Sequence, residues 1–150
     1  MTKFRVFELS SGKIISGGKD ADNNDELVWQ ASPKDTLLHT FAPGSPFVNV
    51  GENPTKQEIN EAAVFCAKFS RDWRDNKKDV TVNKFQRSDM SKEKKAKAGS
   101  WSVKKQETIK VKKSEILKLE KQLNGIEKKA YEKKNETDKK TSDRKKWFNA

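Results

Sequence analysis

Short segments that mix apolar and polar residues predict β-strands within residues 1–50. Apolar and β-branched residues stand among polar neighbours, as in short strands, in residues 3–9, 13–16, 36–41 and 47–50. The turn-forming sequences Ser10-Ser11-Gly12 and Pro43-Gly44-Ser45-Pro46 lie between the members of each pair. The first two segments therefore predict a hairpin, and the last two predict strands joined by a tight turn.

Two segments carry the signals of helices instead. Residues 22–25 (Asp-Asn-Asn-Asp) supply candidate N-caps for a short helix that ends at residues 32–35. The clearest helix begins after Pro54, where Thr55 and Glu58 form a capping box. Its apolar stripe keeps a helical spacing through Ile59, Ala62, Ala63, Cys66, Phe69 and Trp73.

The second half of the chain predicts a strand, a loop, a hairpin and a helix. Residues 80–85 alternate as a strand, and residues 91–99 form a lysine-rich loop. Residues 100–103 and 108–111 predict a closing hairpin. Ser114 can cap a further helix that ends at Asn124-Gly125. Beyond it the chain is almost entirely polar and charged, which is typical of either an exposed helix or a disordered tail.

These elements together predict an α+β fold. We expect one mixed, largely antiparallel sheet of about six or seven strands, packed by two or three helices. Residues 1–123 form the predicted folded domain, and residues 124–150 a basic C-terminal tail that is helical or disordered. With 150 residues, of which 32% are hydrophobic and 37% charged, the chain can bury one modest core but not two.

The same composition limits where the protein acts. No run of about 18 apolar residues occurs, so no membrane span and no membrane partner are expected. The N-terminus lacks a secretory apolar segment. A single cysteine excludes an internal disulfide framework. We therefore expect a cytoplasmic protein.

The positive charge is concentrated in the second half of the chain. Residues 1–79 hold 11 Lys and Arg against 12 Asp and Glu, a net of −1, whereas residues 80–150 hold 22 against 10, a net of +12. Residues 80–113 alone hold 11 against 3. A lysine-rich surface can serve solubility. Clustering of this kind, however, favours a polyanion partner, because counterion release rewards it on a phosphate backbone.

Few residues fit enzyme chemistry. The single histidine, His39, excludes paired-histidine catalysis and histidine-rich metal sites, and in a predicted strand it is most simply a packed structural residue. Gly17-Gly18-Lys19 lacks the spacing of a phosphate-binding loop. The acidic residues near Asp22 lack the later glutamate of an EF-hand, and helix capping explains them. Cys66 lies in the apolar stripe, as a core residue would. We expect no catalytic residue, no metal and no small-molecule cofactor.

The basic segment instead suggests a binding site for RNA. Cations that follow a phosphate backbone, together with aromatic rings that stack on bases, suit single-stranded or looped RNA. Trp101 is a candidate stacking residue, although it fits a core position equally well. Arg71 and Arg74 either complement a helix dipole or extend the patch. The candidate RNA-binding residues are Arg71, Arg74, Lys84, Arg87, Lys92, Lys94, Lys95, Lys97, Trp101, Lys104, Lys105 and Lys110.

The order of several short motifs resembles a known family. The carriers of the resemblance are Asn24-Asp25-Glu26-Leu27, Asp35-Thr36-Leu37-Leu38-His39, Pro43-Gly44-Ser45, Glu61-Ala62-Ala63, Phe69-Ser70, the lysine-rich loop with Gly99, and Ile109-Lys110-Val111. Over about residues 3–113 the chain resembles the NFACT-R domain. That domain is the RNA-binding module of large ribosome-associated quality-control proteins, such as the bacterial fibronectin-binding protein A group and the eukaryotic nuclear export mediator factor.

The resemblance implies a compact, non-catalytic α/β module that binds tRNA or the large ribosomal subunit during translation. It marks Asn24, Asp25, His39, Pro43, Gly44 and Ser45 as family-motif positions with structural or functional roles. The large members also carry an N-terminal NFACT domain, a helix-hairpin-helix segment and a coiled coil. None of these is in this sequence, so the resemblance implies a stand-alone module without peptide-tailing activity.

Two other functions are kept as alternatives. One is an RNA-modifying enzyme that uses His39 with a nearby polar residue such as Ser45. The other is a protein-interaction adaptor in which the charged segment 126–150 folds on an acidic partner.

Overall fold

The computed structural model of the chain describes residues 3–125. The chain divides into two units, Met1–Ile116 and Leu117–Ala150. The first unit contains a six-stranded sheet, a small two-stranded sheet and the helices α1, α2 and α3. A further helix, residues 113–125, begins at the end of the first unit and continues into the second.

The main sheet has six strands in the order β1-β2-β4-β3-β5-β8, and each neighbouring pair is antiparallel. Its strands are β1 (Arg5–Glu8), β2 (Ile14–Gly17), β3 (Asp35–Thr40), β4 (Val48–Glu52), β5 (Val80–Gln86) and β8 (Glu107–Val111). This arrangement confirms the predicted α+β class and strand number. The sheet is antiparallel throughout the described residues rather than mixed.

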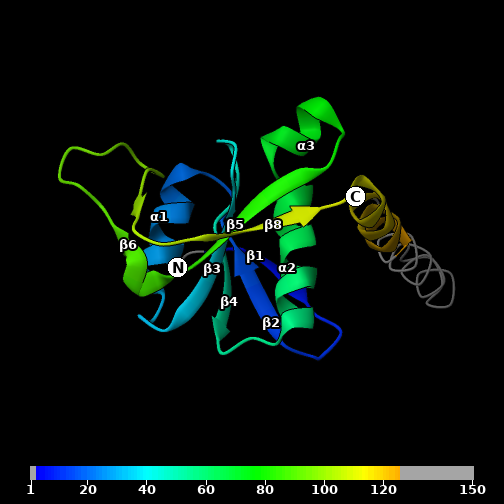
Figure 1. Ribbon diagram of the computed structural model, residues 1–150, viewed down its shortest axis with the longest axis horizontal. Helices are drawn as coiled ribbons and strands as arrows, with labels where there is room; N and C mark the ends of the chain where they lie inside the picture. The colour runs from blue at the N-terminus through cyan, green and yellow to red at the C-terminus, as the bar shows by residue number, and fades with distance from the viewer. Residues whose placement is uncertain (1–2, 126–150) are drawn as a thin grey trace, which may run out of the picture. The chain divides into compact units, whose positions relative to one another are not determined.

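Helices α1 (Ala21–Gln30) and α2 (Lys56–Lys68) lie on either side of the central strands (Figure 1). Leu27 of α1 packs in one cluster with Leu37 of β3 and Phe85 of β5. Successive residues of a strand point to opposite faces, so Leu38 points away from α1, toward the face that α2 covers through its contacts with β3, β4, β5 and β8. The sheet thus separates two apolar layers.

The predicted helix through Trp73 is wrong, because the chain forms two helices there. Helix α2 ends at Lys68, and α3 spans Arg71–Asn76. The Ser70 hydroxyl accepts a hydrogen bond from the Trp73 amide at 3.1 Å and donates to the Ala67 carbonyl at 2.7 Å. One side chain therefore closes α2 and caps α3. Trp73 is still buried, at 1% exposure, so the apolar stripe marks the core correctly across the break.

The predicted closing hairpin of residues 100–103 with 108–111 is also wrong. Strand β8 pairs with β5, whereas β7 (Ser102–Val103) pairs with β6 (Met90–Ser91), which follows the short 3-10 helix η1 (Arg87–Asp89). Burial explains the difference, because Met90 lies in the cluster under α1, and Trp101 and Val103 pack against it. Residues 101–103 therefore pack under α1 and pair with β6 instead of pairing with β8, the next strand in sequence.

The last described helix starts at residue 113, one position before the predicted cap Ser114. Residues 124 and 125 are helical, so the helix reaches its predicted end at Asn124-Gly125, where the described residues stop. The predicted state of the tail concerns residues 126–150, which lie outside the described residues. No helix among residues 3–125 has both the length and the apolar character to cross a membrane.

Candidate nucleic-acid interface

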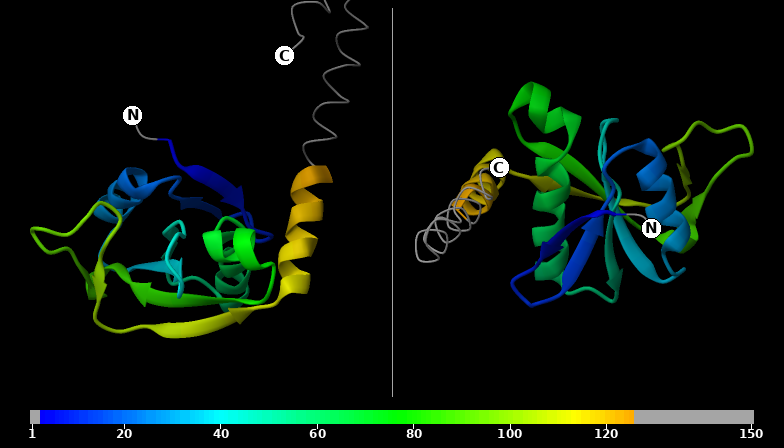
Figure 2. Two further views of the ribbon diagram at one scale, coloured as in Figure 1. Left: turned by 90° about the horizontal axis from the view of Figure 1, so that it is seen from above. Right: turned by 180° about the vertical axis from the view of Figure 1, so that it is seen from behind.

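The densest group of exposed cations lies on the loop between β6 and β7, residues 92–101, which we call the lysine loop. Figures 1 and 2 show it projecting from the domain next to α1. Lys94, Lys95 and Lys97 are exposed on it. None of the three forms an ion pair within residues 3–125, and the loop holds one acidic residue, Glu93. The loop therefore presents net positive charge to solvent.

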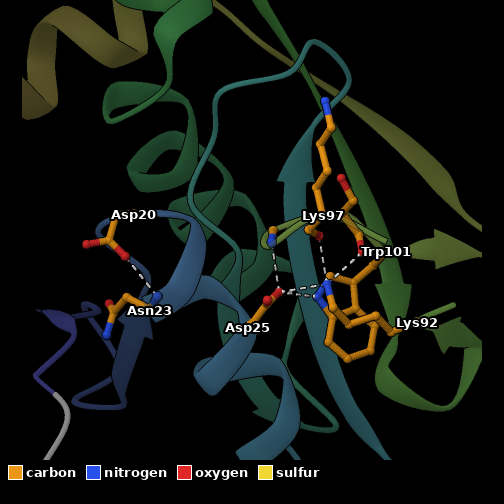
Figure 3. Close-up of polar contacts among 8 residues, drawn as sticks. Asp20, Asn23, Asp25, Lys92, Lys97 and Trp101 are labelled. Carbon is orange, nitrogen blue, oxygen red and sulfur yellow. Dashed lines mark hydrogen bonds and ion pairs between the residues drawn. The ribbon is translucent and has the colours of Figure 1, made fainter. Parts of the chain in front are cut away.

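The lysine loop is fastened to α1 through Asp25. Oδ1 of this half-buried carboxylate accepts hydrogen bonds from the Gly99 amide at 2.9 Å and from the Trp101 indole Nε1 at 2.8 Å (Figure 3). It also forms an ion pair with Lys92 Nζ at 3.3 Å. Charge-assisted hydrogen bonds of this kind are stronger than neutral ones, so Asp25 fixes the loop at its C-terminal end.

Lys92 lies beneath the loop rather than on its surface. Besides Asp25, its ammonium donates to the carbonyls of Lys97 and Ser100, each at 3.0 Å, and lies 5.1 Å from the ring centroid of Trp101. An ammonium group has three protons to donate, and the acceptors above account for all of them. The predicted phosphate contact of Lys92 would have to compete with these partners.

Arg87 sits between two tryptophans next to the loop. Its guanidinium carbon lies 5.1 Å from the ring centroid of Trp101 and 5.5 Å from that of Trp29. Its Nε donates to the Val28 carbonyl at 2.8 Å, and one terminal nitrogen donates to the Met90 carbonyl at 3.3 Å. Arg87 therefore joins α1, β6 and the lysine loop.

Sequence reasoning missed Trp29. This residue lies near the end of α1, is 61% exposed, and meets Trp101 edge-to-face at 4.9 Å between ring centroids. The sequence does contain a signal for the exposure of Trp29, because this residue lies off the helix face that buries Leu27 and Val28. Its neighbours Arg87 and Trp101, however, are distant in sequence.

The other predicted cations of the basic segment lie on β5, between β7 and β8, and on β8. Lys84 is paired with Glu107 at 2.8 Å, so its charge is partly neutralised. Lys104 and Lys105 are exposed directly after β7, and the Lys104 amide donates to the Asp89 carbonyl at 2.8 Å. Lys110 is exposed further along β8, opposite Thr81. Of these cations, Lys104 and Lys105 follow the lysine loop most closely in sequence.

The two predicted arginines are not brought to this surface. Arg71 and Arg74 lie on α3, which Figures 1 and 2 place on the opposite side of the first unit from the lysine loop. Arg74 forms an exposed ion pair with Asp75 at 3.1 Å. Arg71 and Arg74 therefore do not extend the positively charged surface of the lysine loop.

The family-motif residue Asn24 joins α1 to the start of β4. Its Nδ2 donates to the Ser45 carbonyl at 3.2 Å, and its Oδ1 accepts from the Phe47 amide at 3.0 Å. A Cβ atom on Gly18 would lie 1.8 Å from this oxygen.

The predicted helix caps at residues 22–25 are wrong, because the cap is Asp20, which accepts from the Asn23 amide at 2.8 Å (Figure 3). Asn24 and Asp25 instead make long-range contacts.

The Pro43-Gly44-Ser45 motif forms a structural turn. Gly44 has a φ of +86°, which favours glycine, and its carbonyl accepts from the Arg71 amide at 2.7 Å. The buried Ser45 hydroxyl accepts from the Thr40 amide at 3.1 Å and donates to the Pro46 carbonyl at 2.8 Å. The turn thus ties β3 to α3.

His39 is held by packing and by its own backbone. Its Nδ1 donates to the Thr40 carbonyl at 2.7 Å, and its ring lies 4.5 Å from that of Phe47 between centroids. Burial lowers the pKa of the His39 imidazole, and the hydrogen bond to Thr40 acts in the opposite direction. These contacts are those of a neutral structural histidine.

Cys66 is a buried thiol, and the described acidic residues do not form a cluster that could hold a metal ion. Burial raises the pKa of the Cys66 thiol to about 12, which keeps it protonated and poorly nucleophilic. Within residues 3–125, no three His, Cys, Asp or Glu side chains are grouped so as to hold a metal ion.

Comparisons with known proteins agree with this architecture. Among solved structures, the chain is similar to the C-terminal part of the fibronectin/fibrinogen-binding protein from Streptococcus suis, with a TM-score of 0.67 and 25% identity, over 75% of this chain and 46% of that chain. It therefore spans less than half of that structure. No curated protein matches the sequence. Residues 3–105, which include α1 and the whole lysine loop, match the family described as the NFACT protein RNA binding domain. That match extends over more than half of the chain, and the chain therefore belongs to the family of NFACT protein RNA-binding domains.

Proposed function

We propose that this protein is a non-catalytic RNA-binding domain that contacts tRNA or ribosomal RNA during translation in the cytoplasm, including ribosome-associated quality control. Membership of an RNA-binding domain family supports RNA as the partner. The observation that carries the proposal is the lysine loop, whose exposed Lys94, Lys95 and Lys97 are presented on a backbone anchored to Asp25.

Anchoring matters for affinity because binding costs conformational entropy. A loop that must be ordered on binding loses part of its interaction free energy to that ordering, whereas a fixed loop loses less. The Gly99 and Trp101 hydrogen bonds to Asp25, together with the Lys92 bonds to Lys97 and Ser100, restrict the loop before RNA arrives. Phosphate contacts from its lysines then bring affinity with little sequence preference.

Electrostatic binding predicts a steep salt dependence. If four to six cations neutralise phosphates, a plot of log affinity for tRNA against log salt concentration should have a slope of about −3 to −5. A flat response would overturn the proposal, because phosphate neutralisation is its physical basis.

A charge-reversal experiment localises the contact. Changing Lys94 and Lys95 to glutamate should weaken tRNA binding and flatten the salt slope while leaving thermal unfolding unchanged. The matched control reverses Lys56 and Lys78, which are exposed at the start of α2 and after α3, away from the lysine loop. Equal loss of affinity in both pairs would show that only net charge matters, and would remove the lysine loop from the proposal.

The ribosomal setting requires a test in cells. Crosslinking of the full chain to RNA, followed by sequencing of the attached RNA, should recover tRNA or large-subunit ribosomal RNA. Recovery of messenger RNA alone would contradict the translation role, even if RNA binding itself were found.

A further inference from the structure

The exposure of Trp29 is unusual for its residue type. Indole side chains are mostly buried in folded proteins, and in this chain Trp73 is 1% exposed and Trp101 is half-buried. Trp29 is 61% exposed. It does not contribute to the cluster of buried residues under α1 that includes Leu27 and Val28.

Trp29 nevertheless contacts two neighbouring side chains. Its ring meets Trp101 edge-to-face at 4.9 Å, with 65° between the ring planes, and the Arg87 guanidinium lies 5.5 Å from its centroid. Both supports are themselves anchored, Trp101 to the Asp25 carboxylate at 2.8 Å and Arg87 to the Val28 carbonyl at 2.8 Å. The network therefore presents an aromatic surface that needs little ordering before a ligand binds.

The charge around this surface selects the chemistry of the ligand. Arg87 contacts Trp29 directly, and Lys92 and Arg87 both lie over Trp101, whose backbone ends the lysine loop. The Trp29 ring, beside Arg87 and close to the end of the lysine loop, suits a ligand that has both a π-face and a nearby anion. A nucleotide has both, in its base and its phosphate.

We propose that Trp29 is a stacking site for an unpaired RNA base, with the neighbouring phosphates reaching the lysine loop. This inference rests on the proposed RNA-binding function and adds the class of RNA. Bases in a duplex are stacked on one another, and sequence-tolerant stacking on a side chain needs a base that is splayed out. The preferred ligand is therefore RNA with accessible unpaired nucleotides, such as a loop or a free end.

The test compares two RNA probes with equal numbers of phosphates, a hairpin with a single-stranded loop and a blunt duplex. Trp29→Ala should weaken hairpin binding by about 5-fold or more, as for other stacking residues, and leave duplex binding unchanged. Trp29→Phe should retain most of the hairpin affinity. The control is Phe41→Ala, which removes a 72% exposed aromatic side chain at the end of β3, beside Thr81 at the opposite end of β5 from the loop.

Each result separates this inference from the proposed function. Unchanged hairpin binding by Trp29→Ala, or an equal loss on hairpin and duplex, would overturn the stacking site even while charge reversal of Lys94 and Lys95 still weakened binding. Failure of the unmodified protein to bind either probe would overturn the proposed function as well. Retained hairpin binding with loss of a protein partner would assign Trp29 to protein docking instead. Thermal unfolding of each variant checks that the fold is kept.

Discussion

The Asp25 carboxylate and the Trp101 indole are joined by a 2.8 Å hydrogen bond between residues 76 positions apart in sequence. The same oxygen also accepts from the Gly99 amide and pairs with Lys92. One side chain of α1 thus determines the course of a loop whose local sequence encodes no regular structure. The packing of Trp101, and through it the position of Trp29, depends on this bond.

Replacing Asp25 should therefore loosen the lysine loop. Asp25→Ala leaves the Gly99 amide and the Trp101 indole without their acceptor, and we expect a loss of about 1 to 3 kcal/mol in the free energy of unfolding. Hydrogen exchange at Gly99 should accelerate more than exchange in β5. The control is Asp22→Ala, an exposed residue of the same helix. Unchanged exchange at Gly99 would show that the carboxylate does not anchor the loop.

Gly18 is the position where a single added carbon conflicts with the Asn24 bridge. In Gly18→Ala the new Cβ would lie 1.8 Å from Asn24 Oδ1, so the amide must move and release the Phe47 amide. We expect destabilisation of about 1 to 3 kcal/mol, typical of overpacking, measured by urea unfolding.

A double variant tests the cause of that loss. Adding Asn24→Ala to Gly18→Ala removes the clash, so the two changes together should cost less than the sum of each alone. Strictly additive values would place the cost in the backbone of Gly18 rather than in the contact with Asn24.

Ser70 separates two helices that the apolar pattern alone joins. Ser70→Ala removes the acceptor of the Trp73 amide and the donor to the Ala67 carbonyl, and should cost about 1 to 2 kcal/mol of stability. Ser114→Ala, at an exposed serine, should change stability by less than about 0.5 kcal/mol. Equal effects of the two variants in thermal unfolding would contradict the capping role of Ser70.

His39 gives the chain a pH dependence that can be assigned to one group, since it is the single histidine. Burial lowers its pKa in the folded state, so the unfolded state takes up the proton first as the pH falls. Stability should decline as the pH drops below about 6.5, the ordinary histidine value, by at most about 1.4 kcal/mol per pH unit. His39→Gln should remove this slope between pH 7 and pH 5. A slope that persists in the variant would assign the effect to other groups.

The structural features that the sequence predicts correctly are those set by nearby residues. The capping box of Thr55 and Glu58 lies within one turn, and both of its hydrogen bonds are present. The strand segments and the exposed charge of Lys94 and Lys95 follow equally from nearby residues. These features need no knowledge of which segments meet.

The features that sequence reasoning missed depend on distant partners. Nothing near Ser102 indicates that β7 pairs with β6 rather than β8, because that choice follows from burial of Met90 and Trp101 under α1. The same holds for Arg71 and Arg74, which only the fold places away from the lysine loop. Trp29 belongs to the candidate site because it contacts Arg87, which is 58 positions away in the sequence.

Arg87 provides a test of whether geometry or charge holds the aromatic surface. Its planar guanidinium donates to two carbonyls and lies against two rings. Lysine keeps the charge but cannot reproduce that geometry. Arg87→Lys should therefore cost about 1 to 2 kcal/mol of stability and shift the tryptophan emission. The control is Arg74→Lys, at an exposed ion pair with Asp75, where less than about 0.5 kcal/mol is expected. If Arg87→Lys leaves both stability and emission unchanged, the positive charge alone holds Trp29 and Trp101 in place.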